Sequence, residues 1–240
     1  FGSVAKYIAV STREASFDLA SMAKTSTKVF IIEVMGRNAG WIAAAGGMAS
    51  DEATDIPIVI LFPEVAFDRE RFILAVNRKV KRFGYCTVVV SEGARDAQGH
   101  FLADQGLRDA FGHTQLGGVA PIVAAMIRDD LGLKYHFAVA DYLQRAARHI
   151  ASRTDVEQAY ATGRAAVEFA LQGKNAVMPT IVRTSDKPYR WKIGQADLNR
   201  IANRDKKMPR SFITRNGMGI TAQCRQYLAP LMSGEDYPTY

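Results

Sequence analysis

Residues 28–41 read KVFIIEVMGRNAGW, and this stretch decides the fold class. Its first eight residues include a run of β-branched and other apolar side chains, which is typical of a buried strand. Gly36 and the polar residues after it break the strand, and the small residues between Trp41 and Ala45 then favour a helix. A buried strand that turns directly into a helix is the repeating unit of α/β proteins.

The rest of the chain alternates the same two signals. Further strands are predicted at 58–62, 86–90, 135–139 and 176–183. Helices are predicted at 4–22, 68–83, 119–131 and 154–171. Pro179 is typical of an edge strand, Gly132 of a helix C-cap, and Thr154 with Glu157 of a capping box. Together these elements predict an α/β fold with a layered, largely parallel sheet flanked by helices.

A modest break near residues 148–154 divides the chain in two. We expect an α/β domain at residues 1–150 and a separate C-terminal basic segment at residues 151–240. The chain opens at Phe1, inside a predicted helix, so we also expect it to be part of a longer protein.

Positive charge is concentrated towards the C-terminus. The chain has a net charge of +7, and residues 161–240 carry 13 Lys or Arg against 6 Asp or Glu. Such a surface attracts nucleic acid, acidic partners or phosphorylated metabolites, although a solvated basic face is an equally good interpretation. Only Tyr189 and Trp191 lie nearby as aromatic side chains on which bases could stack, which makes nucleic acid a weak candidate.

Composition disfavours several other classes of protein. No apolar run approaches the roughly 20 residues of a membrane span, and no export signal opens the chain. Cys86 and Cys224 are too few for a disulfide framework, which favours a reduced, cytoplasmic setting. His113, His136 and His149 lack the spacing of metal ligands. Neither a Walker-type phosphate loop nor a serine triad is recognisable.

Three polar groups directly follow predicted strands. They are Met35, Gly36 and Arg37 after the first, Glu92 after the third, and Tyr142 and Arg145 after the fourth. In open α/β sheets, ligands bind beyond the carboxyl ends of the strands. Gly36 permits a ligand to approach the backbone, guanidinium groups suit phosphate, and a carboxylate accepts hydrogen bonds from hydroxyls. The three groups together therefore predict a pocket for a sugar phosphate.

Each group also has a simpler interpretation. A Gly-Arg pair after a strand is common, and Glu92 alone is best read as a loop carboxylate or a helix cap. Arg145 and Arg148 are also what the solvated side of an amphipathic helix would carry. The joint position of the groups at successive strand ends, and not any one of them, favours the pocket.

The segment at 31–41, IIEVMGRNAGW, resembles the MGR motif of phosphofructokinases. The resemblance continues through SEG at 91–93, YLQR at 142–145, KKMPRSFI at 206–213 and PLMSGEDYPTY at 230–240, and so covers essentially the whole chain. The tryptophan after MGRNAG, the YxxR form and the GEDYP stretch are most similar to the pyrophosphate-dependent branch of the family. The resemblance implies a phosphofructokinase-like sheet.

The resemblance also implies a role for each residue of the predicted pocket. Residues 35–37 would contact fructose 6-phosphate, and Arg37 would also lie near the transferring phosphoryl group as a catalytic residue. Glu92 would bind the sugar hydroxyls, and Tyr142 with Arg145 would hold the 6-phosphate.

Two further positions depart from the ATP-dependent pattern. Lys28 stands where those enzymes carry an arginine that reaches the substrate of a neighbouring subunit. His136 falls near the position of another such arginine. Their expected contacts with phosphate therefore lie across a dimer, and the resemblance implies a homo-oligomer.

Several parts of the family pattern have no counterpart in the 240 residues. These are the glycine-rich donor loop, the Mg²⁺-binding aspartate and the PKTIDND-type segment with its aspartate base. We therefore expect this chain to be a fragment that lacks the N-terminal donor domain and is inactive alone. The Mg²⁺ ligands are expected in the missing N-terminal part. Part of the segment 151–240 would pack against the absent domain, and its apolar surface would be exposed here.

The function implied by the resemblance is a phosphotransferase of glycolysis. It would transfer phosphate from pyrophosphate to O1 of fructose 6-phosphate, with ATP left open as the donor. Two alternatives remain: a non-catalytic anion- or RNA-binding module that uses the basic segment, and a regulatory subunit that keeps the pocket without the chemistry.

Overall fold

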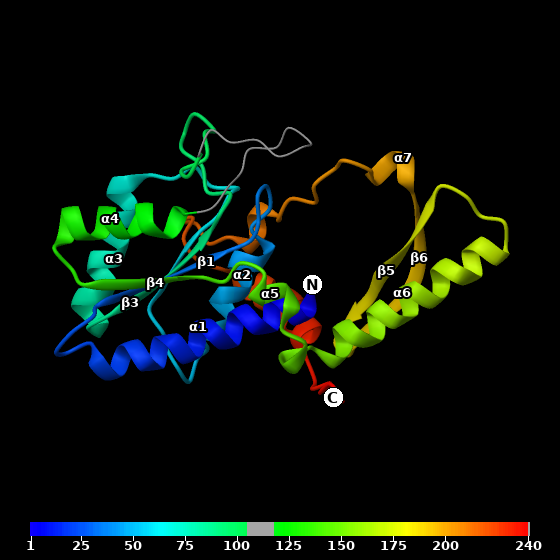
Figure 1. Ribbon diagram of the computed structural model, residues 1–240, viewed down its shortest axis with the longest axis horizontal. Coiled ribbons are helices and arrows are strands. Elements are labelled where there is room, and N and C mark those ends of the chain that lie inside the picture. The colour runs from blue at the N-terminus through cyan, green and yellow to red at the C-terminus, as the bar shows by residue number, and fades with distance from the viewer. Residues whose placement is uncertain (105–117, 240) are drawn as a thin grey trace.

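The computed structural model describes residues 1–104 and 118–239, which form two lobes (Figure 1). The first lobe contains a four-stranded sheet in the order β2-β3-β1-β4, with every neighbouring pair parallel. Its strands are β1 (Val29–Val34), β2 (Ile58–Leu61), β3 (Cys86–Ser91) and β4 (Tyr135–Val139). The predicted parallel sheet is confirmed.

Helices cover both faces of this sheet (Figure 1). One face packs against α3 (Arg69–Phe83) and α4 (Val119–Leu131), and the other against α1 (Gly2–Met22) and α2 (Trp41–Gly46). Side chains alternate between the faces of a strand, so one strand supplies both cores. From β1, Val29 and Ile31 join the first core, whereas Ile32 and Val34 join the second.

The second lobe is a helix packed on a hairpin. It consists of α6 (Arg153–Leu171), the antiparallel strands β5 (Val177–Asp186) and β6 (Tyr189–Asp197), and α7 (Leu198–Ile201). Only Gln158 and Ala165 of α6 are buried, while Tyr160, Val167 and Leu171 are 76%, 62% and 84% exposed. Neither of the two apolar cores described above includes a side chain from α6, β5 or β6.

The C-terminal residues return to the first lobe. They form the turns η3 (Arg210–Phe212) and η4 (Ala229–Met232) and the helix α8 (Ala222–Leu228), and Phe212 and Leu228 join the core beneath α1. The predicted segment 151–240 is therefore shared between the two lobes. How the chain divides into independent domains stays a prediction, although the expected break does fall where α6 begins.

Short elements complete the chain. They are η1 (Gly47–Ala49), α5 (Leu143–Ala146) and η2 (Arg148–Ile150). The polar loop predicted before α4 is described only up to residue 104, and His113 lies outside the described residues.

Of the two helix caps predicted from the sequence, one is found in the structure and the other is not. Gly132 ends α4 in the left-handed conformation, as predicted. The capping box predicted at Thr154 and Glu157 is wrong, because Ser152 caps α6 by accepting a hydrogen bond from Asp155 N. Tertiary packing selects this earlier start, since Ser152 Oγ also lies 2.7 Å from the Leu231 carbonyl.

Candidate functional site

The three polar groups predicted to form a pocket meet at the carboxyl edge of the sheet. Val34 at the end of β1 pairs with Ser91 at the end of β3, and Glu33 pairs with Val139 at the end of β4. Because the strands are parallel, the segments that follow them leave the sheet at the same edge. The structure thus brings together residues 35–37, Glu92 and residues 142–145.

Direct hydrogen bonds join the first two groups. Gly36 N donates to Glu92 Oε1 at 3.0 Å, and Ser91 Oγ donates to the Gly36 carbonyl at 2.6 Å. Gly36 has a φ of +144°, and a Cβ atom there would lie 2.7 Å from the Ala39 carbonyl oxygen. The position therefore requires glycine, as the sequence predicted for a backbone that must be approached closely.

The third group is attached through Gln144, which the sequence analysis did not single out. This side chain is 1% exposed, accepts a hydrogen bond from Met35 N at 3.2 Å and donates to the Asp141 carbonyl at 2.8 Å. It therefore fixes α5 beside the turn after β1. A buried amide needs hydrogen-bond partners, but a single sequence does not reveal which glutamine is buried.

Tyr142 and Arg145 lie on the outer side of α5. The Arg145 guanidinium stacks over the Tyr142 ring at 4.1 Å from its centroid, and Tyr142 is 62% exposed. The predicted neighbourhood of phenol and guanidinium is therefore present. The hydroxyl group of Tyr142 and the guanidinium group of Arg145 can therefore both donate hydrogen bonds to one anion.

Arg37 sits in the turn that follows β1 and is half-buried. Its backbone lies against the loop after β3, since a Cβ atom on Gly93 would come within 2.0 Å of the Arg37 carbonyl oxygen. Among residues 1–104 and 118–239, the guanidinium has no hydrogen-bond or ion-pair partner. Its donors are therefore free for a ligand.

Lys28 and His136 lie elsewhere in the same chain. Lys28 directly precedes β1 and donates to the Ala23 carbonyl, and His136 pairs with Phe30 near the start of β4. A strand of six residues is about 20 Å long, and Arg37 follows the carboxyl end of β1. Lys28 and His136 therefore lie towards the amino ends of the strands, at the opposite end from Arg37. The structure does not bring them to the cluster, and their predicted contact across a dimer stays a prediction.

Glu33 is a buried carboxylate that the sequence analysis did not select, although a charge within FIIEV is a visible signal. Its two oxygens accept hydrogen bonds from Gly118 N at 3.1 Å and Ala120 N at 2.8 Å, which satisfies the start of α4. Desolvation raises the pKa of Glu33, and the nearby Glu92 raises it further, while the backbone donors oppose the change.

The carboxyl edge thus has the chemistry that a sugar phosphate requires. Arg37 and Arg145 supply fixed positive charge, and Tyr142 supplies a hydroxyl. Glu92 uses one oxygen for Gly36, and the other is available to a ligand hydroxyl. The arrangement can hold a phosphorylated acceptor.

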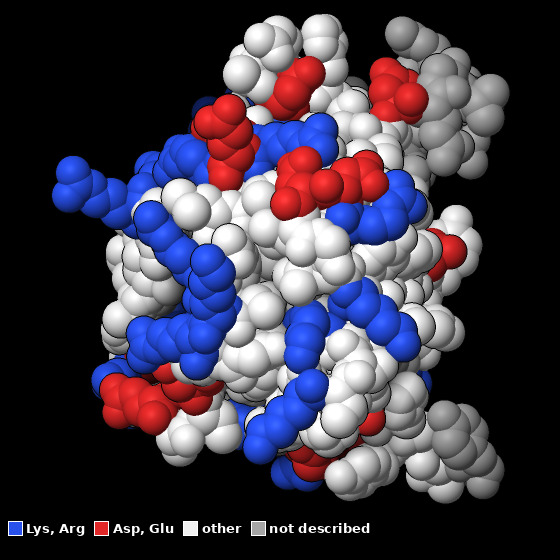
Figure 2. Space-filling model, turned by 90° about the vertical axis from the view of Figure 1, so that its left-hand side faces the viewer, with Lys and Arg blue, Asp and Glu red and all other residues white. Residues whose placement is uncertain are grey.

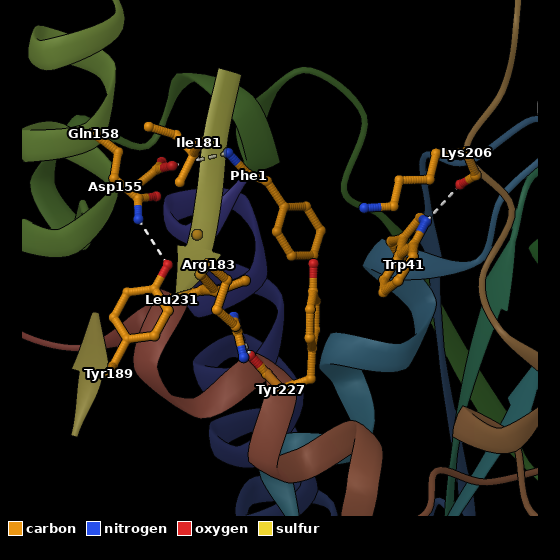
Figure 3. A pocket seen from close by; sticks show the side chains of 11 residues that line it. Phe1, Trp41, Asp155, Gln158, Ile181, Arg183, Tyr189, Lys206, Tyr227 and Leu231 are labelled. Atoms are coloured by element: carbon orange, nitrogen blue, oxygen red, sulfur yellow. Dashed lines mark hydrogen bonds and ion pairs between the residues drawn. The ribbon is translucent and has the colours of Figure 1, made fainter. Parts of the chain in front are cut away.

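A cavity of about 370 Å³ lies between the lobes (Figure 3). Aromatic side chains line it, among them Trp41 and Tyr227, with the Arg183 guanidinium over the Tyr227 ring at 4.1 Å. Phe1 also lines it, and its amine lies 3.0 Å from Asp155 Oδ1. None of the predicted site residues lines this cavity.

Three arginines of the C-terminal basic segment donate hydrogen bonds to backbone carbonyl groups of the same chain. Arg183 donates to the Tyr227 carbonyl, Arg210 to that of Ile213, and Arg225 to that of Ser50. Arg183 and Arg225 join segments far apart in the sequence, and Arg210 holds its own turn, which weakens the case for a nucleic-acid surface.

The outer face of α3 and α4 carries charges of both signs. Figure 2 shows Lys and Arg side chains interspersed with Asp and Glu on this side of the molecule. Arg69 forms a two-point hydrogen-bonded pair with Asp130, and Arg128 lies 2.8 Å from Asp129. The mixture is typical of a solvated surface.

Neither a metal centre nor a membrane helix is found in the part of the chain that the structure describes. No group of three or more His, Cys, Asp or Glu side chains there could hold a metal ion. None of its helices is long and apolar enough to cross a membrane.

Comparison with known proteins gives consistent results. The family model for phosphofructokinase matches residues 6–170. The pyrophosphate–fructose 6-phosphate 1-phosphotransferases of Methylococcus capsulatus and Halomonas elongata are 68% and 63% identical to this chain over 240 residues. The crystal structure of a pyrophosphate-dependent phosphofructokinase from Nitrosospira multiformis covers 100% of the chain with a TM-score of 0.90 and 63% identity.

The alignment covers the whole of this chain but only part of each relative. All 240 residues align with the curated relatives, but the chain spans 57% of their length and 57% of the solved Nitrosospira chain. The motifs that first indicated the resemblance lie in the parts that align. The chain belongs to the phosphofructokinase family.

Proposed function

We propose that the full-length protein transfers a phosphoryl group from pyrophosphate to O1 of fructose 6-phosphate, a step of glycolysis, and that this chain binds the sugar phosphate. The observation that carries the proposal is the hydrogen bond from Gly36 N to Glu92 Oε1, which joins two of the sheet-edge groups. Gln144 joins the third through Met35 N. These two contacts connect three segments that lie far apart in the sequence, and the proposal places the sugar phosphate against them.

Each residue has a definite task in this proposal. Met35, Gly36 and Glu92 position the sugar, with a Glu92 oxygen accepting from its hydroxyls. Tyr142 and Arg145 hold the 6-phosphate. Arg37 stabilises the negative charge on the transferring phosphoryl group, because its guanidinium is permanently charged and otherwise unpaired among the described residues.

Pyrophosphate is proposed as the donor because the similar proteins are named for it. Mg²⁺ is proposed to accompany it, but the described residues do not fit a site for this ion. Its ligands are therefore expected outside these residues, and no catalytic step of this chain depends on it. Cys86 and Cys224 are free, buried thiols, in agreement with a cytoplasmic protein.

A homo-oligomer, at least a dimer, is also proposed. Strand β4 is an edge strand of the sheet, and its Phe137 and Val139 side chains are 44% and 45% exposed. His136 in the same strand is also exposed. An exposed apolar edge favours contact with a second chain. Lys28 and His136 would then approach the phosphate bound by the partner.

The test is the reaction of the full-length protein with fructose 6-phosphate and either pyrophosphate or ATP, with Mg²⁺ present. Arg37→Ala is expected to lower kcat about 100-fold to 1000-fold, because it removes charge stabilisation at the transferring group. Arg145→Ala is expected to raise KM for fructose 6-phosphate about 10-fold to 100-fold, because it removes a charge-assisted phosphate contact.

Arg82→Ala, on the exposed last turn of α3, is the matched control and should leave both constants unchanged. Absence of phosphoryl transfer from either donor would refute the proposed reaction. Transfer from ATP alone would refute only the choice of donor. Binding of RNA that weakens steeply with salt, in place of sugar-phosphate binding, would favour the nucleic-acid alternative.

A further inference from the structure

The turn that carries Arg37 has no regular secondary structure of its own and is held at its two ends. Residues 35–40 connect β1 to α2. At the sugar side, Gly36 N donates to Glu92. At the far side, Gly40 N donates to both oxygens of Glu64, at 2.9 and 3.1 Å. Arg37 lies between these two anchors.

Glu64 follows β2 and packs tightly on the far end of the turn. A Cβ atom on Gly40 would lie 2.7 Å from Glu64 Oε2 and 2.8 Å from Phe62 Cδ1. Gly40 is itself buried. The carboxylate therefore receives the backbone N–H at close range, and only glycine leaves room for it.

The same carboxylate also binds a distant segment. Met208 N donates to Glu64 Oε1 at 3.1 Å, although the two residues are 144 positions apart. Two neighbouring contacts tie the turn to the same segment: Asn38 Nδ2 donates to Asp205 Oδ2 at 2.8 Å, and Trp41 Nε1 donates to the Lys206 carbonyl at 2.7 Å. Residues 202–208 form the connection by which the chain leaves the second lobe (Figure 1).

We propose that Glu64 is a positioning residue that holds the Arg37 turn in its working geometry and ties it to the connection from the second lobe. The inference rests on the proposed function, since it gives Glu64 a role only if Arg37 acts on the phosphoryl group. A cavity of about 340 Å³, lined by Glu64, Asn38 and Asp205 among others, lies beside this contact.

A specific kinetic effect follows from the two anchors. Glu92 holds the end of the turn that contacts the sugar, so loss of Glu64 leaves Gly36 in place. The far end, next to Arg37, loses the bond of Gly40 N and keeps only the side-chain bonds of Asn38 to Asp205 and Arg95 and of Trp41 to the Lys206 carbonyl, so it is loosened. Misplacement of a catalytic group by about 1 Å costs up to about 100-fold in rate, with less effect on substrate binding.

The experiment compares Glu64→Ala with Glu64→Gln in the full-length protein, together with Arg37→Ala. Glu64→Ala is expected to lower kcat about 10-fold to 100-fold with KM for fructose 6-phosphate within about threefold. Glu64→Gln keeps an oxygen for Gly40 N and Met208 N, so kcat should return to within about threefold of wild type. Glu70→Ala, an exposed carboxylate in the first turn of α3, is the control.

The outcomes separate the two proposals. If wild type is active and Arg37→Ala is not, but Glu64→Ala keeps full kcat, the inference is overturned and the proposed function stands. The inference is also overturned if kcat and KM change together and glutamine restores nothing, because a purely structural residue behaves in this way. If wild type itself transfers no phosphate, both proposals fail together.

A second variant decides the matter if Glu64→Ala does not fold. Asp205→Ala removes the exposed bond to Asn38 Nδ2 and leaves the core untouched. It is expected to lower kcat about threefold to tenfold at unchanged KM, through the same loosening of the turn. Unchanged kcat in this variant would overturn the inference.

Discussion

At the scale of single residues, the site depends on backbone positions as much as on charged side chains. Gly36 has a φ of +144° and lies within contact of both Ala39 and Ser91. Its N–H is the donor that reaches Glu92. The same residue therefore shapes the turn and completes the connection between two strand ends.

We predict that Gly36→Ala weakens both folding and substrate binding. The left-handed backbone and the 2.7 Å approach to the Ala39 carbonyl should cost about 1–3 kcal/mol of unfolding free energy. Fructose 6-phosphate should bind at least about 10-fold more weakly, because the turn shifts away from Glu92. Denaturant unfolding and calorimetric titration of the full-length protein measure the two effects.

Gly99→Ala is the matched control for this substitution. Gly99 has a φ of +86°, but nothing lies within 4 Å of a Cβ atom there. It should lose about 1 kcal/mol from backbone strain alone and keep its affinity for the sugar phosphate. Equal affinities in Gly36→Ala and wild type would show that the turn does not contact the substrate.

At the scale of elements, the second lobe is thinly packed. Helix α6 has 19 residues, of which two are buried, so its stability depends strongly on its own helical preference. Gly163 lies in its middle and nothing is within 4 Å of a Cβ atom placed there. The helix therefore contains a flexible residue that packing does not require.

We predict that Gly163→Ala stabilises α6. Replacing an unstrained helical glycine should add about 0.5–1 kcal/mol, because alanine loses less backbone freedom on folding. Slower amide hydrogen exchange within residues 153–171 would report the gain. Gly194→Ala in β6 should have the opposite effect, since its Cβ atom would lie 2.6 Å from Val182 Cγ2. Faster exchange in Gly163→Ala would contradict the argument.

At the scale of the whole molecule, the chain is a lobe built on a parallel sheet that is joined to a thinly packed second lobe. The polar groups of residues 35–37, Glu92 and residues 142–145 meet at the carboxyl edge of the sheet in the first lobe. The exposed side chains of Tyr160, Val167 and Leu171 are apolar surface of the kind that another part of a protein covers. These features agree with a chain that spans 57% of its relatives.

We predict that residues 1–240 alone bind fructose 6-phosphate but do not phosphorylate it. The proposed function places the sugar phosphate at the positive groups of the sheet edge, whereas no group of three or more His, Cys, Asp or Glu side chains among the described residues could hold the donor's cation. Titration calorimetry should detect binding that Arg145→Ala weakens, and a coupled assay with pyrophosphate and Mg²⁺ should detect no turnover. Turnover at the rate of the full-length protein would contradict the prediction.

The amino-acid sequence by itself determined the elements of the first lobe and the polar groups that follow its strands. Burial patterns and turn residues are local, so the run at 29–34 and the glycine after it are legible without a structure. The motifs at 35–37, 91–93 and 142–145 were sufficient to indicate the phosphofructokinase family, which the comparisons then showed.

Only the tertiary structure decided which residues hold that site together. Gln144 reaches Met35 across 109 positions and Glu64 reaches Met208 across 144, and no local pattern encodes either partner. Lys28 and the motif at 35–37 flank the same strand, and the length of that strand places them at its opposite ends. Contacts of this kind depend on strand order and on how distant segments pack, because hydrogen bonds require positions correct to a fraction of an ångström.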